Sequence, residues 1–373
     1  MKPSPFFLID AHLDIAYNAL EWGRDLRQSA FQTREREERE HPDYQNPDAA
    51  GGITMVGLPE LRRAGFGIIF STLMAFPWES ASQEVGKQYT QTQTYSSSDE
   101  AYRVGQQQLA YYRELAQESG ISLIQTQSDL SSLLVDWRQV SPEEEQRPVG
   151  LVLLMEGADP IRTPGEAEQW WLDGVRLVGL SWNTGSRYAG GNVTGGPLTQ
   201  AGRELLAQMQ RLRMALDTSH LSEESFWQAL ESFQGRVLAS HSNCRALVPR
   251  ARELSDEMIR AIAERGGVIG ISPGNFFLVP GWSRDPKPVS LERMVAHLDH
   301  VCQLTGNAHH VGIGSDIDGG FGRDETPTEL ETIADLLKLS AALRGAGYSQ
   351  EDVRNIMGGN WLRFLERVLP EEG

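Results

Sequence analysis

Eight short apolar runs recur along the chain, and longer stretches with helical character separate most of them. Runs of this length and composition are typical of strands that are buried on both faces of a parallel sheet. The runs span residues 6–12, 66–74, 150–157, 176–182, 213–220, 236–242, 267–274 and 310–316. Eight strands that alternate with helices predict an α/β fold of the (β/α)8 TIM-barrel type rather than an open doubly wound sheet.

Several of the intervening stretches begin with a residue that commonly starts a helix. Ser222, Ser255 and Ser290 each precede a helical pattern, and Pro327 stands just inside the start of another. Barrels of this kind commonly run to about 250 residues or more as one domain. The 373 residues therefore predict a single barrel domain over 1–373.

Polar segments interrupt the pattern and predict long loop insertions in the barrel. Residues 31–51 are charged and then rich in turn-forming residues, whereas residues 79–99 contain few large aliphatic side chains. A glycine-rich segment at 184–197 predicts a further loop. The short run at 122–126 could form a ninth strand, but we assign it to the insertion that precedes the third run.

The balance of charge limits the partners. The chain has 34 Lys and Arg against 51 Asp and Glu, a formal charge of −17. Such a surface repels phosphate backbones and anionic lipids, so we expect a small-molecule substrate and neither a nucleic-acid nor a membrane partner, with a homodimer left open. Two cysteines, Cys244 and Cys302, and an N-terminus without an apolar run of signal-peptide length predict reduced thiols in a cytoplasmic protein.

Acidic and imidazole side chains stand at the ends of five of the eight runs. They are His12 with Asp14, Glu156, His220, His241 and Asp316. The C-terminal ends of barrel strands converge on one face, where the active sites of these proteins lie. Each residue alone is equally well explained as an isolated polar group at a strand exit. Together, however, so many buried carboxylates would be costly without a cation, and the pattern therefore predicts a metal site.

The order of the residues indicates two metal ions. His12 and Asp14 are two positions apart, so both side chains point to one side of a strand and can bind one ion. His220 and His241 follow neighbouring strands and suit a second ion, zinc or another divalent metal. Glu156 lies between these pairs and could bridge them. Two ions about 4 Å apart can bind one hydroxide and polarise a carbonyl group.

Asp316 follows the last run and is left over from this ligand set. A carboxylate beside such a centre could take a proton from the attacking water and return it to the leaving amine. We therefore interpret Asp316 as the general base and acid.

The chain resembles the membrane (renal) dipeptidases and their bacterial relatives, which are binuclear zinc peptidases on an amidohydrolase-like barrel. The similarity covers nearly the whole chain, and its pieces occur in the family's order: IDAHLDI, LLMEGAD, DTSHLS, SHS, SDIDGG and IMGGNWLRFL. The resemblance implies the same ligands, namely His12 and Asp14 for one zinc ion, Glu156 as the bridge, and His220 and His241 for the other. It also implies Asp316 as the acid and base.

The resemblance further implies that Arg252 binds the terminal carboxylate of the substrate, a task that suits the bidentate guanidinium group. A surface arginine at the start of a helix is the alternative. One position departs from the family, because Trp182 replaces a histidine that holds the scissile carbonyl oxygen. Loss of such a donor can cost roughly 10²–10³ in rate, so either Asn183, Arg187 or another loop group substitutes or the substrate differs.

Three functions follow from these residues. The first is a zinc-dependent dipeptidase. The second is the same binuclear hydrolase acting on another small amide or ester, such as an N-acyl amino acid or a lactone, and Trp182 motivates it. The third is a non-catalytic binding barrel that keeps its metal for stability, although structural zinc sites usually have no open position for water.

Overall fold

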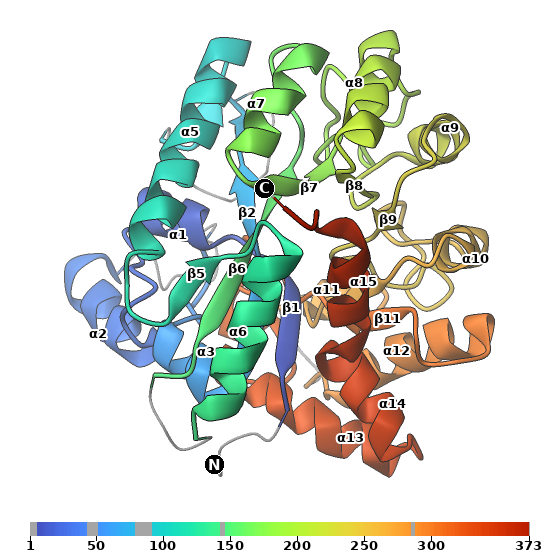
Figure 1. The fold of residues 1–373 in the computed structure, drawn as a ribbon. Helices are drawn as coiled ribbons and strands as arrows, with labels where there is room; N and C mark the ends of the chain where they lie inside the picture. Colours follow the sequence, from blue (N-terminus) through green and yellow to red (C-terminus); the bar gives the residue numbers. More distant parts are fainter. Residues whose placement is uncertain (1–5, 43–50, 79–91, 142–145, 285–287, 373) are drawn as a thin grey trace.

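Eight parallel strands form a ring, and helices follow one another around its outside (Figure 1). The computed structural model describes residues 6–42, 51–78, 92–141, 146–284 and 288–372. In spatial order the strands are β10 (Ile269–Ile271), β11 (Val311–Ile313), β1 (Leu8–Leu13), β2 (Phe66–Met74), β6 (Val149–Glu156), β7 (Val175–Gly179), β8 (Ala215–Asp217) and β9 (Val237–Leu238). Each overlaps one of the eight predicted runs, which confirms the TIM-type barrel.

A short contact closes the ring between β9 and β10. Ala239 and Ile269 form a parallel bridge, and the amide of Gly270 donates to the carbonyl of Ala239 at 2.8 Å. A Cβ at Gly270 or Gly314 would lie only 1.8 or 1.7 Å from the carbonyl oxygen of Ser240. Both positions therefore need glycine, because the backbone after β9 passes very close to its neighbours here.

The assignment of 122–126 to an insertion was wrong in part, because β5 (Ile121–Leu123) is a parallel strand that pairs with the start of β6. One edge of β6 pairs with β2 over nearly its whole length. The other edge pairs with β7 only over its second half, from Leu153 to Met155. The first half of that edge would otherwise leave backbone groups unpaired, and β5 pairs with them.

Helices cover the outer face of the ring, with α5, α7, α8, α9, α10 and α12 spread around it in Figure 1. The described α-helices are α1 (Ile15–Trp22), α2 (Ala30–Glu40), α3 (Leu58–Ala64), α5 (Ser98–Leu115), α6 (Gln127–Gln139), α7 (Ala167–Leu172), α8 (Gln200–Arg211), α9 (Glu223–Ser232), α10 (Asp256–Glu264), α11 (Asn275–Leu278), α12 (Glu292–Thr305), α13 (Leu339–Gly345), α14 (Gln350–Arg354) and α15 (Asn360–Val368). A small second sheet joins β3 (Phe76–Pro77) and β4 (Thr94–Tyr95).

Alternate residues of the strands fill the inside of the ring, as the period of two in a strand requires. Val152 and Leu154 of β6 belong to this interior cluster, and α15 adds Trp361, whose ring lies 5.3 Å from that of Phe70. The chain just before α15 touches the start of β1, so this helix covers the end of the ring where the strands begin. Glu156, the next inward position of β6, therefore lies at the opposite, open end.

The predicted helix starts are confirmed at Ser222 and Ser255, whose hydroxyl groups accept from the amides of Ser225 and Met258. A helix also follows Ser290. The prediction at Pro327 was wrong, because the chain there forms turns, and a 3₁₀ helix (Ile333–Lys338) precedes α13. The amide of Thr328 instead donates to the carbonyl of Val289, a long-range contact that the local pattern does not reveal.

The first insertion contains regular structure. Residues 30–40 form α2, which begins with a capping box between Ser29 and Gln32. Arg24 holds this helix to the barrel through a buried ion pair with Glu37 at 2.7 Å. Residues 43–50 and 79–91 of the insertions lie outside the described residues.

Both cysteines, Cys244 and Cys302, are buried free thiols, in agreement with the prediction. None of the described helices combines the length and the apolar character that crossing a lipid bilayer requires.

Candidate metal centre and substrate cavity

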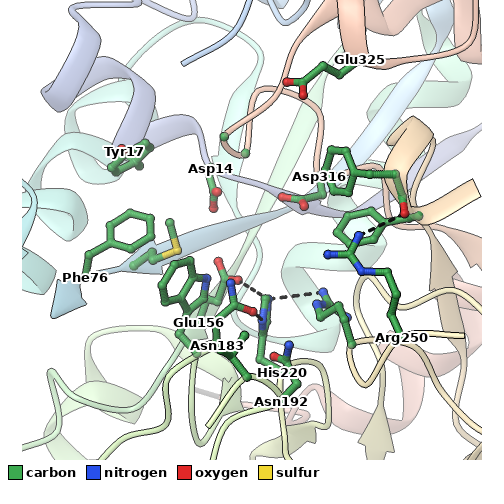
Figure 2. A pocket seen from close by; sticks show the side chains of 18 of the residues that line it. Asp14, Tyr17, Phe76, Glu156, Asn183, Asn192, His220, Arg250, Asp316 and Glu325 are labelled. Carbon is green, nitrogen blue, oxygen red and sulfur yellow. Dashed lines mark hydrogen bonds and ion pairs between the residues drawn. The ribbon is translucent and has the colours of Figure 1, made fainter. Parts of the chain in front are cut away.

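A cavity of about 720 Å³ opens at the ends of the strands where the predicted site residues lie. Asp14, Glu156, His220 and Asp316 line it, and His241 lies directly beneath with its side chain almost fully buried. Figure 2 shows Asp14, Glu156, His220 and Asp316 facing one another in the middle of the cavity. The ends of β1, β6, β8, β9 and β11 thus bring together all six residues that the sequence singles out.

Glu156 stands between two groups of side chains, and each of its carboxylate oxygens faces one group. Its Oε2 lies 3.1 Å from Nε2 of His12, and His12 Nε2 lies 3.7 Å from Oδ1 of Asp14. Its Oε1 lies 2.9 Å from Nε2 of His220 and 3.6 Å from Nε2 of His241. A carboxylate in this position can contact two cations at once, one on each side.

The partners of the imidazole groups fix which nitrogen faces the cavity. Nδ1 of His220 lies 2.8 Å from Oδ1 of Asn183, and Nδ1 of His241 lies 2.7 Å from the hydroxyl of Ser240. An amide oxygen only accepts hydrogen bonds, so His220 carries its proton on Nδ1 and leaves Nε2 bare when neutral. Nε2 is also the nitrogen that points at Glu156 in each of the three imidazoles.

The bare nitrogens lie close together. Nε2 of His220 is 2.8 Å from Nε2 of His241, and both face Oε1 of Glu156. A terminal guanidinium nitrogen of Arg252 also lies 3.3 Å from Nε2 of His220. Two unprotonated nitrogens at the distance that separates the imidazoles repel each other unless a proton or a cation lies between them. Among the described residues, three sets have ligand atoms within 4.8 Å of one another and could hold a metal ion: His12 with Asp14 and Glu156, Glu156 with His220 and His241, and His12 with His241 and Asp316. Imidazole and carboxylate together are donors that suit zinc and similar divalent metals.

The electrostatics of the centre also favour a cation. Burial raises the pKa of Asp14 to about 7, and the charge of Glu156 adds to this effect. Burial likewise raises the pKa of Asp316 well above its usual range. Burial lowers the pKa of His220 to about 4, with the charge of Arg252 adding to the shift. Asp14 and Asp316 thus resist ionisation where they lie, and a metal ion beside them would remove that cost. Burial also acts to raise the pKa of Glu156, but the charges of His12 and His220 and their hydrogen bonds outweigh it and lower that pKa.

The pKa of His12 also reflects the excess of negative charge in the centre. Burial alone would lower its pKa, but the carboxylates of Glu156, Asp14 and Asp316 outweigh burial and raise the pKa to about 10. A metal ion bound by His12 would have to displace the proton that this raised pKa favours.

Two residues of the centre have a left-handed backbone. His220 has a φ of 66° and Asp316 a φ of 56°, a backbone region that residues other than glycine rarely adopt. The amide of Asn192 donates to the carbonyl of His220, and the amide of Asp316 donates to the carbonyl of His12. These contacts hold the two residues in a conformation that turns both side chains into the cavity.

The cavity has two different sides. Arg250 and Arg252 lie on one, with Arg252 almost fully buried above the ring of Phe277. Arg252 donates to the hydroxyl of Ser242 at 2.8 Å and to the carbonyl of His241 at 2.6 Å. Its Nε is buried and has no partner among the described residues. Arg252 is therefore a buried residue of the cavity and not a surface arginine, which was the alternative that the sequence left open.

Aromatic and apolar side chains form the other side, and Trp182 is one of them. Its ring meets that of Phe76 edge to face at 4.7 Å, and Phe76 in turn contacts Tyr17 at 5.3 Å. Met74 belongs to the same cluster. Figure 2 shows Tyr17 and Phe76 on one side of the acidic groups and Arg250 on the other.

The two loop residues that could replace the missing histidine behave differently. Asn183 lines the cavity beside Trp182, with its amide oxygen directed at His220. Arg187 is not part of the cavity lining, because it donates to the carbonyl of Arg162 and to the hydroxyl of Ser98. Arg187 therefore cannot act as the substitute donor.

Sequence reasoning missed several residues around the centre. Ser240 and Asp217 lie beneath it. In the sequence the only indication was their position, because Ser240 directly precedes His241 and Asp217 stands three residues before His220. Tyr17 and Phe76 reach the cavity from α1 and β3. Arg250 precedes Arg252 by two residues, and this spacing could have indicated a pair of cationic groups.

Comparisons with known proteins give one consistent family. The sequence profile described as "Membrane dipeptidase (Peptidase family M19)" matches residues 4–370. An uncharacterised Klebsiella pneumoniae protein from the pqqA 5′ region is 35% identical over 233 residues, or 60% of this chain and 84% of that protein. The dipeptidase tcpJ of Claviceps purpurea is 33% identical over 202 residues, which span 52% of this chain but only 45% of the fungal protein.

Solved structures share the fold over almost the whole chain. A Rhodobacter sphaeroides metallopeptidase, crystallised with a phosphinate mimic of the dipeptide L-Ala-D-Ala, is 24% identical with a TM-score of 0.75, and the match covers 98% of this chain and 100% of that one. The probable dipeptidase PvdM of Pseudomonas aeruginosa is 18% identical with a TM-score of 0.76, over 98% and 96% of the two chains.

Proposed function

Because the chain belongs to the membrane dipeptidase family, peptidase family M19, we propose that it is a metal-dependent hydrolase that cleaves dipeptides. The observation that carries this proposal is the position of Glu156, whose two oxygens face two separate sets of metal-ligating groups. The cavity above it has an arginine on one side and room for a small substrate.

Two of the three ligand sets share Glu156, and each of these two would hold one divalent ion, most simply zinc. His12 and Asp14 would hold one ion, His220 and His241 would hold the other, and Glu156 would contact both. When bound, such ions lower the pKa of water and polarise a carbonyl group, which supplies a nucleophile and an electrophile at neutral pH.

The remaining residues bind the substrate and move its protons. Arg252 binds the terminal carboxylate of the dipeptide, because it lines the cavity beside the ligand groups and a guanidinium group matches a carboxylate in shape. The scissile bond then lies over Glu156 and Asp316. Asp316 accepts a proton from the attacking water and delivers it to the leaving amine, since it lies beside the ligand groups at 3.9 Å from Nε2 of His12.

The first prediction concerns removal and return of the metal. Chain treated with a chelator should lose its activity on L-Ala-D-Ala and L-Ala-L-Ala, and two equivalents of Zn²⁺ per chain should restore it. Elemental analysis would measure the number of zinc ions per chain, and a chromogenic assay of the released amine would measure the activity. The same dipeptides with an amidated C-terminus should be poor substrates, because Arg252 then has no carboxylate to bind. Full turnover by metal-free chain would refute the proposal.

A second candidate function keeps the metals and changes the acyl side of the substrate. The wall opposite Arg252 consists of Tyr17, Met74, Phe76 and Trp182, whose accessible groups are largely apolar. An amino acid with a large apolar acyl group and no free ammonium would suit this wall, so N-acyl amino acids are the alternative substrate class. Lactones would not use Arg252, which makes them the weaker choice.

The second prediction separates these substrates. Compounds with a large apolar group on the acyl side should have a higher kcat/KM than their glycyl or acetyl counterparts. Trp182→Ala should lower kcat/KM for the large compounds by roughly 10–100-fold, because burying such a group contributes about 1.5–3 kcal/mol. Steady-state kinetics on matched dipeptides and N-acyl amino acids would measure this.

Trp282 provides the control, since it also lines the cavity but lies on the arginine side. Its ring is 6.4 Å from that of Phe276, over which Arg250 lies at 5.9 Å. Trp282→Ala should leave the acyl-side preference unchanged. If Trp182→Ala keeps the preference for large apolar acyl groups, the apolar wall does not bind the acyl side of the substrate. Activity on N-acyl amino acids alone would favour the second function over the first.

A further inference from the structure

One hydroxyl group lies beneath the centre, within hydrogen-bond distance of one histidine from each ligand set. The Oγ of Ser240 is 3.0 Å from Nδ1 of His12 and 2.7 Å from Nδ1 of His241. It also lies 2.5 Å from Oδ2 of Asp217 and 3.4 Å from the hydroxyl of Ser219. Ser240 is fully buried, so no solvent competes for these contacts.

The number of hydrogen atoms and lone pairs decides the direction of each contact. A serine hydroxyl has one hydrogen to donate and two lone pairs that accept. The carboxylate of Asp217 only accepts, and its distance to Ser240 is the shortest, so the single hydrogen of Ser240 points to Asp217. Both imidazole contacts must then be donations from Nδ1–H to the two lone pairs of Ser240.

Asp217 is itself fixed in orientation. Its Oδ1 accepts from the amides of Ser219 at 3.1 Å and of Ser240 at 2.9 Å. These two bonds hold the carboxylate across the ends of β8 and β9, and they leave Oδ2 for the hydroxyl. The chain of contacts therefore runs from Asp217 through Ser240 to both histidines.

We propose that Ser240 is a positioning residue shared by the two metal sites, which fixes His12 and His241 with Nδ1 protonated and Nε2 free to bind metal. The inference rests on the proposed function, because it assigns His12 to one ion and His241 to the other. Its consequence is that occupancy of the two sites depends on a single hydroxyl. His220 differs, since Asn183 is its partner and acts on one site alone.

The experiment measures the zinc dissociation constants of variants at Ser240 and at Asn183. Each metal-free variant is titrated with Zn²⁺ in competition with a chelator of known affinity. Loss of an outer-shell partner typically weakens metal binding by roughly 10–100-fold. Ser240→Ala should raise both dissociation constants by about this factor. Asn183→Ala is the matched control and should raise only one of them.

Asp217→Asn provides a second variant if Ser240→Ala does not fold. The amide oxygen would remain with the two backbone donors, so the NH₂ group would face Ser240 and occupy one of its lone pairs. One Nδ1–H would then lose its acceptor, and metal binding should weaken although the hydroxyl is still present. Substitution of Co²⁺ should show the change as a shifted absorption spectrum.

The outcomes separate this inference from the proposed function. Wild-type chain that binds fewer than two ions overturns both. Wild-type chain that binds two ions, with Ser240→Ala within threefold of it or weakened at one site only, overturns the shared role of Ser240 and leaves the function intact.

Discussion

Glu156→Gln is expected to abolish the activity and to lower the metal content below two ions per chain. The substitution keeps the shape of the side chain but removes the charge and replaces one oxygen by an NH₂ group, which cannot bind a cation. Because each oxygen of Glu156 faces a different ligand set, either orientation of the amide damages one of them. The loss of kcat/KM should exceed the roughly 10–100-fold that follows from loss of an outer-shell partner.

Elemental analysis and kinetics would test this result, and Glu325→Gln is its control. Glu325 lines the same cavity but pairs with Arg284 and is not part of the three ligand sets. That variant should still bind two ions. Circular dichroism should show that both variants keep the fold. Two tightly bound ions and near-normal turnover in Glu156→Gln would contradict a bridging role.

Asp316→Asn is expected to lower kcat by roughly 10²–10⁴, the usual range for loss of a general acid or base. The metal content should stay at two ions, because Asp316 belongs only to the set with His12 and His241, and the other two ligand sets are complete without it. KM should change little, since the amide fills the same space in the cavity and Arg252 is unaffected.

Asp318 offers a matched comparison two residues further along the chain. It is also buried and has a φ of 66°, but its carboxylate accepts from the hydroxyl of Thr54 and from the amides of Met55 and Val56. Asp318→Asn should therefore lower the thermal stability and leave kcat close to that of the wild type. An Asp316→Asn variant with kcat within threefold of the wild type would exclude Asp316 as the acid and base.

The sequence was sufficient to place the barrel and to bring the six residues of the centre together. This succeeded because strand ends in a parallel barrel share one face, so position along the chain gives position in space. Glu156 illustrates it, since it continues the inward series of Val152 and Leu154 by two residues. Assigning metals to these residues stays a prediction.

Features that depend on contacts between distant segments could not be derived in this way. The strand β5 exists because β7 leaves half of one edge of β6 unpaired, and no local pattern shows that vacancy. Ser240 is an ordinary serine in the sequence, and the role proposed for it depends on the four groups that surround its hydroxyl. Arg187 illustrates the opposite error, because a cationic residue close to Trp182 in the chain points away from the cavity.

The left-handed backbone of His220 and Asp316 has a consequence for how far this fold can be made more robust. A residue with a side chain gives up about 1–2 kcal/mol in that conformation relative to glycine, which is a sizeable part of the 5–15 kcal/mol that holds a typical protein folded. Glycine would relieve the strain at both positions, but it would also delete the side chains that face the cavity. Selection for heat resistance and selection for turnover therefore oppose each other at these two residues, and substitutions that raise stability must be sought elsewhere in the barrel.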